Sequence, residues 1–488
     1  MPAPRHIAVL GGGLTGLSSA FHLSRRFPDA SITLLERQSK LGGWVRSDKV
    51  IVENVGSGGS PATVLLEGGP RTLRPNAKSV LELINLLGLD SAVITTSKSS
   101  PAAKTRFLQI PELPGLLPIP SSVASLLSSP LRSILLTAVG REIFRRSNRP
   151  KGIKDESLDR FMTRRFGEPF ARTFGSALIH GIYATDSKKL SVRAAFPSLW
   201  EAEERGWGSV VVGFLRGSKF KLKSDYDLGG TIQLMHNASV YSFRGGMQTL
   251  TNALELSLSV RPNVKILRDT QVSSLRLQKS KAFEISLSSG AALSPTHVIS
   301  TLSLPVLQNI LPDPGALPHL TANPYSSVTV VNLVFPAPPS EIHPEGFGYL
   351  IPRPTTGYSS ESPRFLGTVF DSCSLSAQDT PAPLTKLTVM MGGPYPALTE
   401  EHMSLPFIKR HLEDHLQRSL PDPVYWKVRR NDNCIPTLTP GHLERMQELR
   451  NVLWERWEGR LEVIGAGVGG VSVGDCVDAG KRAGEAWS

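Results

Sequence analysis

Cysteine is scarce in this chain of 488 residues. The three cysteines, Cys373, Cys434 and Cys476, lie far apart and form no C-x-x-C pair. An odd, scattered set of this kind indicates neither a disulfide framework nor a zinc site. A reducing or redox-neutral compartment is therefore the expected setting.

Long hydrophobic runs are also missing. No stretch reaches the ~18 to 20 uninterrupted apolar residues of a membrane-spanning helix. The best candidate, residues 121–140, contains several serines, Pro130 and Arg132. An apolar strand pattern begins within six residues of Met1, which leaves no space for a cleavable targeting peptide. We therefore expect no bilayer-spanning helix and an internal signal for any organelle.

The composition excludes a disordered or fibrous protein, since 40% of the residues are hydrophobic and 20% charged, both close to globular averages. The length suits two to four structural units. Lys and Arg exceed Asp and Glu by 12, which favours an anionic partner such as phosphate, carboxylate or lipid headgroups. No nucleic acid is expected, because the basic residues are scattered and form no recognised binding motif.

A dinucleotide site is predicted at the start of the chain. Residues 7–10 read as a buried strand, residues after 14 as a helix, and residues 32–35 as a second strand that ends at Glu36. Gly11, Gly13 and Gly16 form G-x-G-x-x-G at the first turn, where the backbone can approach a pyrophosphate. Glu36 can accept hydrogen bonds from an adenosine ribose. A merely tight turn is the alternative.

Two further glycine clusters refine this prediction. L-G-G-W at 41–44 lets a second loop approach the nucleotide, which favours a flavin over a nicotinamide; an ordinary glycine turn is the alternative. Gly465, Gly467 and Gly470 repeat G-x-G-x-x-G, but only 18 residues follow. We expect this last strand, turn and helix to join the N-terminal sheet, so that both chain ends hold one cofactor and a substrate domain is inserted between them.

The middle of the chain changes character twice. Residues 111–215 show mainly helical patterns, and residues 216–240 lack clear periodicity, which is typical of an exposed, mobile insertion. From Gly245 onwards alternating apolar residues predict strands, for example at 264–269, 272–277 and 328–335.

Taken together, the motifs closely resemble the protoporphyrinogen oxidase family of haem biosynthesis. The resemblance is collinear over essentially the whole chain except 216–240. Its glycine-rich parts are shared with amine oxidases and carotene desaturases, whereas R-F-L, G-F-G and V-S-V-G-D-C are more specific. The motifs are G-G-G-L-T-G (11–16), L-G-G-W (41–44), E-G-G-P-R-T-L-R (67–74), R-F-L (106–108), H-G-I-Y-A (180–184), F-P-S-L-W (196–200), R-G-G-M (244–247), G-F-G-Y-L (346–350) and G-G-V-S-V-G-D-C (469–476).

The resemblance implies an α/β fold: a Rossmann-type FAD-binding domain, a p-hydroxybenzoate-hydroxylase-like substrate domain and an inserted helical membrane-docking domain. The implied limits are 1–85, 241–300 and 451–488 for the FAD-binding domain, 86–110 and 301–450 for the substrate domain, 111–215 for the helical domain and 216–240 for the insertion.

The resemblance also implies one non-covalent FAD per chain. Arg71 has an alternative role, a salt bridge that holds two segments together. The residues expected to contact FAD are Gly11, Gly12, Gly13, Leu14, Thr15, Gly16, Glu36, Trp44, Gly69, Pro70, Arg71, Thr72, Val272, Val471, Ser472 and Val473.

For the substrate, the resemblance assigns Arg106 to a propionate, Gly181 to a backbone contact, and Phe347, Leu350 and Met390 to the macrocycle. A guanidinium binds a carboxylate bidentately, and an apolar slot suits a tetrapyrrole. The alternatives are a surface cation for Arg106 and ordinary core for Phe347 and Leu350.

His180 could act as a general base or be purely structural. The family commonly reads A-G-D or A-G-N where this chain has Ala184-Thr185-Asp186, so the shape of this loop is left open.

The implied reaction is the six-electron oxidation of protoporphyrinogen IX to protoporphyrin IX, with dioxygen as acceptor and release of hydrogen peroxide. No catalytic side chain and no metal are assigned, since the flavin accepts the hydride. Related substrates, namely coproporphyrinogen, an amine or a polyene, are the main alternative. A non-catalytic binding protein and an inactive scaffold are the others.

Residues 121–149 alternate apolar patches with arginines, as in a helix on an anionic membrane surface. The alternative is a helix packed internally with a solvated basic end. The resemblance implies peripheral attachment to the mitochondrial inner membrane, a homodimer and contact with ferrochelatase. The arginines are Arg132, Arg141, Arg145, Arg146 and Arg149.

Overall fold

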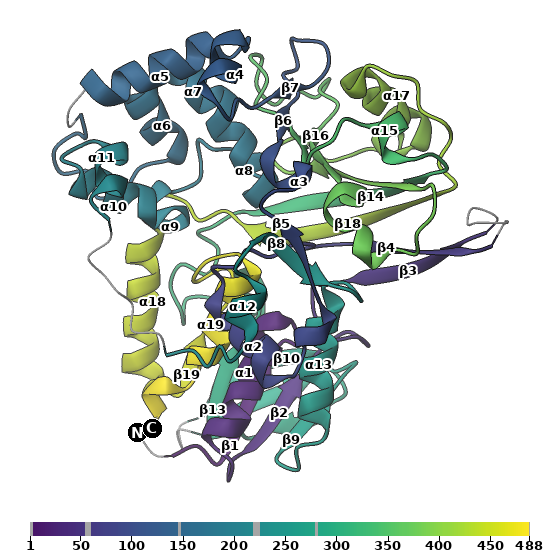
Figure 1. Cartoon of the computed structure of the whole chain (residues 1–488). Coiled ribbons are helices and arrows are strands. Elements are labelled where there is room, and N and C mark those ends of the chain that lie inside the picture. Colours follow the sequence, from purple (N-terminus) through teal and green to yellow (C-terminus); the bar gives the residue numbers. More distant parts are fainter. Residues whose placement is uncertain (1–2, 54–59, 145–147, 218–224, 279–281, 488) are drawn as a thin grey trace.

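The computed structural model describes residues 3–53, 60–144, 148–217, 225–278 and 282–487. Figure 1 shows a lower part, with β1, β2, β9 and β13, an upper part built on a large sheet, and a group of helices beside the upper part. Both ends of the chain lie at the bottom of the lower part.

The lower part contains a five-stranded sheet in the order β19-β13-β1-β2-β9, and every neighbouring pair is parallel. The prediction that the C-terminal strand joins the N-terminal sheet is confirmed. The strands are β1 (His6–Leu10), β2 (Ser31–Leu35), β9 (Val264–Leu267), β13 (His297–Ser300) and β19 (Leu461–Val463).

The two faces of this sheet are covered by different elements. Ile7 and Val9 pack into one core cluster, while Ala8 and Leu10 pack into another, as the alternation of a strand requires. The first face carries α1 (Leu14–Arg26), α2 (Lys78–Leu86), α13 (Gln248–Ser259) and α19 (Val473–Arg482). The second carries the sheet β10 (Val272–Leu277), β11 (Phe283–Leu287) and β12 (Ala292–Leu293), with α14 (Leu304–Ile310) and α18 (His442–Trp457).

The upper part contains a seven-stranded sheet in the order β18-β14-β17-β16-β15-β6-β7. All its pairs are antiparallel except β15 with β6. Helix α17 (Leu405–Leu416) packs on one face. The strands are β6 (Phe107–Leu108), β7 (Leu117–Pro118), β14 (Tyr325–Phe335), β15 (Gly348–Leu350), β16 (Phe365–Phe370), β17 (Thr385–Gly392) and β18 (Tyr425–Pro436).

Two antiparallel ribbons and several short helices connect the parts. One ribbon is β3 (Ser47–Val52) with β4 (Ala62–Glu67), and the other is β5 (Val93–Ser97) with β8 (Ala238–Phe243). The short helices include α3 (Pro101–Lys104), α12 (Thr231–Leu234), α15 (Pro339–Ile342) and α16 (Asp371–Ser374).

The helical group is held by buried ion pairs. Arg164 bonds Glu156 at 2.6 Å and also pairs with Glu203, and Arg165 pairs with Glu142. The helices are α4 (Val123–Ser128), α5 (Arg132–Phe144), α6 (Leu158–Phe166), α7 (Glu168–Phe170), the π-turn Ala171–Gly175, α8 (Ser176–Tyr183), α9 (Val192–Ala195), α10 (Pro197–Arg205) and α11 (Val210–Leu215). In the part of the chain that the structure describes, no helix combines the length and apolar character needed to span a bilayer.

The expectation of an exposed segment without regular structure at 216–240 is wrong for residues 225–240. This stretch contains α12 and the start of β8, and Thr231, Met235 and Ala238 are buried. The Tyr226 hydroxyl bonds Asp478 at 2.5 Å. These contacts come from distant segments, so local periodicity does not reveal them. Residues 218–224 lie outside the described residues.

Two predicted domain limits fall inside structural units. The limit at 450 cuts the continuous helix α18, and β7, within the predicted helical domain, pairs with β6 of the upper sheet. The other limits stay predictions.

Candidate active site

The first glycine turn is shaped so that side chains would not fit. Gly11 has φ +100°, and a Cβ on Gly16 would overlap the carbonyl oxygen of Gly11. Helix α1 begins directly after Gly13 without a side-chain cap. Its first-turn N–H groups are therefore free of a side-chain partner, which is the arrangement that binds phosphate.

Glu36 closes this turn from the second strand. One carboxylate oxygen accepts the N–H of Gly12 at 2.8 Å, and the other accepts the N–H of Gln38 at 2.8 Å. Each oxygen retains a further lone pair for a ribose hydroxyl. The Glu36 carbonyl accepts the N–H of Thr270, two residues before Val272, so the predicted contact residue Val272 lies near the same end of the sheet.

The second glycine loop lies against the first. Gly42 donates its N–H to the Gly12 carbonyl at 2.8 Å, and the two Cα-only residues Gly13 and Gly43 face each other. A Cβ on Gly69 would overlap the Trp44 carbonyl oxygen, so the predicted stretch Gly69 to Thr72 adjoins this loop. Residues lacking Cβ atoms thus line a cradle wide enough for a dinucleotide backbone.

The C-terminal turn completes the cradle. Ser472 caps α19 in a capping box with Asp475, and Ser18 of α1 donates to the Val477 carbonyl at 2.9 Å. Cys476 lies against Thr15, and burial raises the pKa of its thiol to about 11. The predicted residues Val471, Ser472 and Val473 therefore lie at a helix N-terminus beside that of α1.

Arg71 is buried and forms a salt bridge with Asp371, whose Oδ1 lies 3.2 Å from Nη1. Thr388 of β17 donates to Asp371 Oδ2 at 2.5 Å, and the Arg71 carbonyl accepts from Ser242. The structure therefore gives Arg71 the bracing role, since its guanidinium ties the cradle to the upper sheet. Asp371 could not be found from the sequence, because it lies 300 residues away.

The predicted substrate residues come together on the upper part. The Arg106 guanidinium lies 5.7 Å from the centre of the Phe347 ring and donates to the Ala103 carbonyl at 3.0 Å. A Cβ on Gly181 of α8 would lie 2.7 Å from Leu350 Cδ2. Leu350 and Met390 both pair with Gly367 on the intervening strand.

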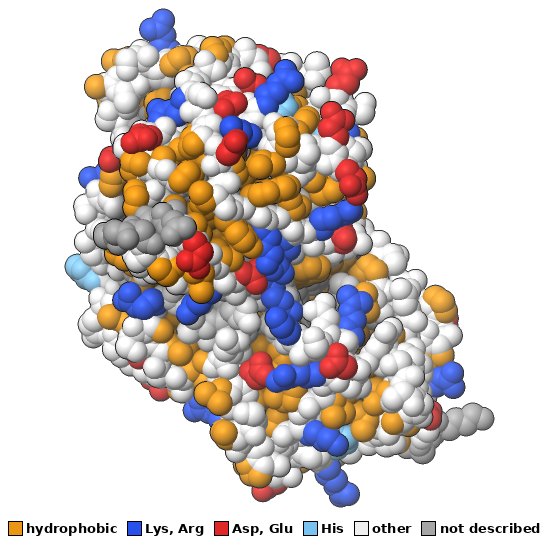
Figure 2. Space-filling view, turned by 90° about the vertical axis from the view of Figure 1, so that its right-hand side faces the viewer, with side chains coloured by type: hydrophobic (Ala, Val, Ile, Leu, Met, Phe, Trp, Pro, Cys, Tyr) orange, Lys and Arg blue, Asp and Glu red, His pale blue; other side chains and the backbone are white. Residues whose placement is uncertain are grey.

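These contacts form one continuous wall. Phe347, Leu350 and Met390 are all partly exposed, and Arg106 is exposed at its edge. Figure 2 shows hydrophobic side chains gathered on the upper half of one face of the molecule, with Lys and Arg side chains below them.

Glu67 is a buried carboxyl group that the sequence did not single out. It follows β3 and β4 into the cradle and accepts hydrogen bonds from the Met247 N–H at 2.8 Å and the Ser47 hydroxyl at 2.7 Å. Burial raises the pKa of Glu67 to about 7.

Glu67→Gln is expected to weaken the pH dependence of stability. Because the folded-state pKa lies above the ordinary value, the stabilisation is complete below pH 4.5 and is lost as the pH rises through 7. The loss amounts to about 3 kcal/mol, and glutamine, which is always neutral, avoids it. Thermal unfolding at pH 5 and pH 8 measures the effect. Glu462, with its pKa also raised to about 7, leaves a residual slope, but an unchanged slope in the variant would contradict the prediction.

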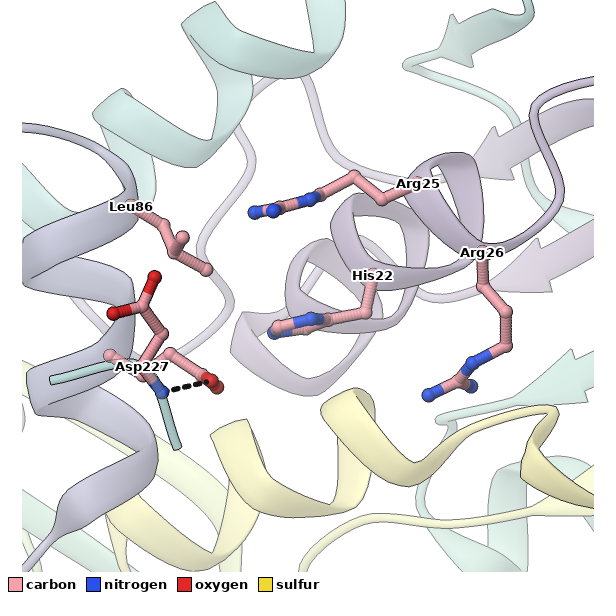
Figure 3. A pocket seen from close by; sticks show the side chains of 6 residues that line it. His22, Arg25, Arg26, Leu86 and Asp227 are labelled. Carbon is pink, nitrogen blue, oxygen red and sulfur yellow. Dashed lines mark hydrogen bonds between the residues drawn. The ribbon is translucent and has the colours of Figure 1, made fainter. Parts of the chain in front are cut away.

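A separate hollow lies between α1 and α2 (Figure 3). Figure 3 shows His22, Arg25 and Arg26 projecting from α1, opposite Leu86 and Asp227, whose N–H donates to Glu82 at 3.0 Å. His22 lies eight residues after Leu14, which places it about 12 Å along the helix from the glycine turn. This hollow, with both signs of charge, is therefore not part of the cradle.

Comparison with known proteins agrees with this geometry. Residues 14–486 match the family described as flavin containing amine oxidoreductase. The chain belongs to this family. It is therefore a flavin-dependent oxidoreductase with the corresponding α/β fold and mixed sheets.

The predicted resemblance to protoporphyrinogen oxidases is also confirmed. The chain is 33% identical to protoporphyrinogen oxidase of Homo sapiens, over 98% of this chain and 97% of that protein. It is 32% identical to that of Schizosaccharomyces pombe, over 96% of each. Coproporphyrinogen III oxidase of Bacillus subtilis is 25% identical, over 98% of this chain and 97% of that protein.

Solved structures share the fold. A protein from Exiguobacterium superposes with a TM-score of 0.78 at 20% identity, over 100% of this chain and 99% of that one. Cyclohexylamine oxidase from Brevibacterium oxydans gives 0.62 at 15% identity, over 100% and 99%.

Proposed function

We propose that this chain is a protoporphyrinogen oxidase that binds one FAD non-covalently and converts protoporphyrinogen IX to protoporphyrin IX. The observation that carries the proposal is the apolar wall of Phe347, Leu350 and Met390 with Arg106 at its edge. A guanidinium beside an apolar wall suits a flat ring system whose only full charges are carboxylates. Near-full-length relatives that bear this name support it.

The cradle fits FAD in particular. Its glycine turn, its acidic ribose acceptor Glu36 and its second glycine loop suit an adenine dinucleotide, and the length of the cradle from Gly11 to Gly69 suits the flavin end. When bound, the flavin supplies three two-electron oxidations, each regenerated by one dioxygen with release of one hydrogen peroxide. The Cys476 thiol, buried and kept protonated by its raised pKa, supports non-covalent binding.

In this proposal the side chains orient the substrate and do not exchange protons with it. Arg106 fixes a propionate, and Leu350 and Gly181 hold the macrocycle. Each oxidation removes a hydride from a bridging carbon and one pyrrole N–H proton, which passes to solvent, so three steps account for six electrons. Positioning and exclusion of water are thus the contribution of the protein.

Anaerobic stopped-flow mixing tests the proposal. The flavin band should bleach rapidly with protoporphyrinogen IX and slowly with coproporphyrinogen III, and air should then yield porphyrin fluorescence and peroxide. Faster bleaching by coproporphyrinogen III would favour the activity named for the Bacillus subtilis relative. No bleaching by either substrate would overturn the proposal, and amines and polyenes would be tested next.

Arg106→Ala is expected to raise KM for protoporphyrinogen about 10-fold and to change kcat less than about 3-fold, because a lost carboxylate contact is made equally in the ground and transition states. Steady-state porphyrin fluorescence measures both constants. Lys104→Ala, an exposed cation two residues away, is the matched control and should behave as wild type. Unchanged kinetics in Arg106→Ala would remove the propionate contact.

We further propose that the helical group is a membrane-docking domain. Only Ala138 and Glu142 of α5 are buried, which argues against a helix packed internally. Arg149 pairs with Glu203 and Glu204 and stacks on Trp200, so it braces the group and does not face a lipid surface. Arg145 and Arg146 lie outside the described residues. The exposed apolar side chains are Val123, Leu127, Leu136, Val139, Ile143, Phe144, Trp207, Val211, Phe214 and Leu215.

Replacing Val139 and Phe144 together by glutamate is expected to reduce partition onto cardiolipin-containing vesicles at least about 10-fold, since each side chain loses roughly 1.5–3 kcal/mol of apolar burial. Flotation measures the bound fraction. Val260→Glu, equally exposed but on the lower part, is the control. Wild-type protein that stays unbound would contradict the membrane proposal.

The proposed site of action is the mitochondrial inner membrane, reached through an internal signal, with the protein peripheral and homodimeric and in contact with ferrochelatase. The family resemblance and the exposed helical surface support this setting. Mitochondrial subfractionation and sedimentation of the purified protein test the location and the dimer.

A further inference from the structure

His180 of α8 is almost fully buried, and both of its ring nitrogens have partners. Nδ1 lies 2.6 Å from the Ile351 carbonyl oxygen, and Nε2 lies 2.9 Å from the Tyr358 hydroxyl. A carbonyl oxygen only accepts, so Nδ1 carries the proton. Nε2 is then the acceptor, and Tyr358 donates to it.

The surroundings keep this pair neutral. Burial lowers the pKa of His180 to about 4, and burial likewise raises the pKa of the Tyr358 phenol above its ordinary range. The charged groups that face the pair are Asp186 and Arg353, and Arg353 forms ion pairs with Asp159 at 2.9 Å and Asp186 at 3.4 Å. Tyr395 packs edge-on against Tyr358. With no lone pair free on either nitrogen, the imidazole is not arranged to accept a proton from a substrate.

The same histidine lies at the seam between two proposed walls of the substrate site. Gly181, its neighbour on α8, and Leu350, the neighbour of Ile351, approach so closely that a Cβ on Gly181 would collide with Leu350. Two hydrogen bonds tie this seam: His180 to the Ile351 carbonyl, and the Arg353 N–H to the Ser176 hydroxyl at 2.8 Å. The bond made by His180 is the nearer of the two to Gly181.

We propose that His180 is a positioning residue: its Nδ1–H imidazole, oriented by Tyr358, locks α8 onto the end of β15 and so sets the spacing between Gly181 and Leu350 where the macrocycle binds. The inference rests on the proposed function for the identity of the ligand. The hydrogen bonding and the tautomer do not depend on that identity.

Kinetics separate this role from that of a general base. His180→Ala and Tyr358→Phe are expected to raise KM for protoporphyrinogen about 5- to 10-fold with kcat within about 3-fold, since spacing affects binding of the ring. His180→Asn, whose amide N–H can still donate to the Ile351 carbonyl, should recover KM to within about 3-fold of wild type. Tyr395→Phe, which removes a hydroxyl from the same aromatic group, is the matched control and should leave KM unchanged.

Two kinetic outcomes would overturn the proposal. A fall in kcat of about 100-fold or more in His180→Asn, with loss of the wild-type pH profile, would make His180 a base. Unchanged KM in both His180→Ala and Tyr358→Phe would remove the positioning role. If His180→Ala does not fold, Tyr358→Phe, which deletes one oxygen, still decides the question.

A spectroscopic measurement tests the tautomer without substrate. In protein labelled with ¹⁵N-histidine, the His180 signals, identified by their absence in His180→Asn, should show a protonated Nδ1 and an unprotonated Nε2 at pH 7, and the Nε2 signal should shift in Tyr358→Phe. An Nε2–H or doubly protonated ring would overturn the inference. Wild-type protein that fails to oxidise protoporphyrinogen would instead remove the proposed function, and this spectrum would still report on the hydrogen bonds.

Discussion

Gly16→Ala is expected to yield protein that contains less than about one tenth of a flavin per chain. The added Cβ would overlap the Gly11 carbonyl oxygen, and because this neighbour is backbone, relief requires the whole glycine turn to move. The turn and the first N–H groups of α1 are the proposed phosphate-binding elements. The flavin absorbance of the purified protein, relative to its absorbance at 280 nm, measures the loss.

Gly140→Ala provides a matched control. A Cβ at Gly140, inside α5, meets no atom within 4 Å, and alanine favours a helix over glycine by about 0.5–1 kcal/mol. This variant should therefore bind flavin fully and unfold at the same or a slightly higher temperature. A Gly16→Ala protein that retains a full complement of flavin would show that the turn does not position the cofactor.

Asp371→Asn is expected to lower the free energy of unfolding by about 3–5 kcal/mol. The substitution preserves shape but leaves the Arg71 guanidinium, which is buried in the cradle wall, without a counter-charge, and a buried unpaired charge is strongly destabilising. Chemical denaturation followed by tryptophan fluorescence measures the change. Because Arg71 joins the cradle to the upper sheet, loss of flavin should accompany unfolding.

The companion variant removes both charges. Arg71→Met combined with Asp371→Asn should recover at least half of the lost stability, since no charge then remains buried alone. Two single variants and a double variant that all unfold like wild type would show that the pair contributes nothing. An exposed ion pair, Lys409 with Asp422, offers a control in which Asp422→Asn should cost less than about 1 kcal/mol.

The sequence predicts local features of the cradle well. A glycine turn between a strand and a helix depends on neighbouring residues, so Gly11, Gly16 and the proximity of Glu36 follow from spacing alone. The C-terminal turn was assigned to the same sheet because too few residues follow Gly470 to form another unit. The structure agrees in both places.

Features that depend on distant contacts were not predictable. Residues 225–240 have no periodicity of their own, and their order comes from contacts such as Tyr226 with Asp478. The strand β7 has only two residues and exists because β6 lies beside it. Arg149 reads as one of a row of surface arginines, yet Glu203 and Trp200, some 50 residues later, remove it from the surface. The substrate residues were placed by family resemblance, since no spacing rule links Arg106 to Phe347.

The sharing of one sheet by both ends of the chain has a consequence for biosynthesis. The strand β19 and the helix α19, which pack against β13 and α1, are the last elements that a ribosome delivers. The indole of Trp487 even donates to the Gly459 carbonyl and packs on His297. The cradle can therefore close only after translation ends, whereas the exposed apolar helices α5 and α11 have emerged long before. We expect the newborn chain to need protection from aggregation during this interval, and a premature stop near the C-terminus to abolish flavin binding even though every other element has been made.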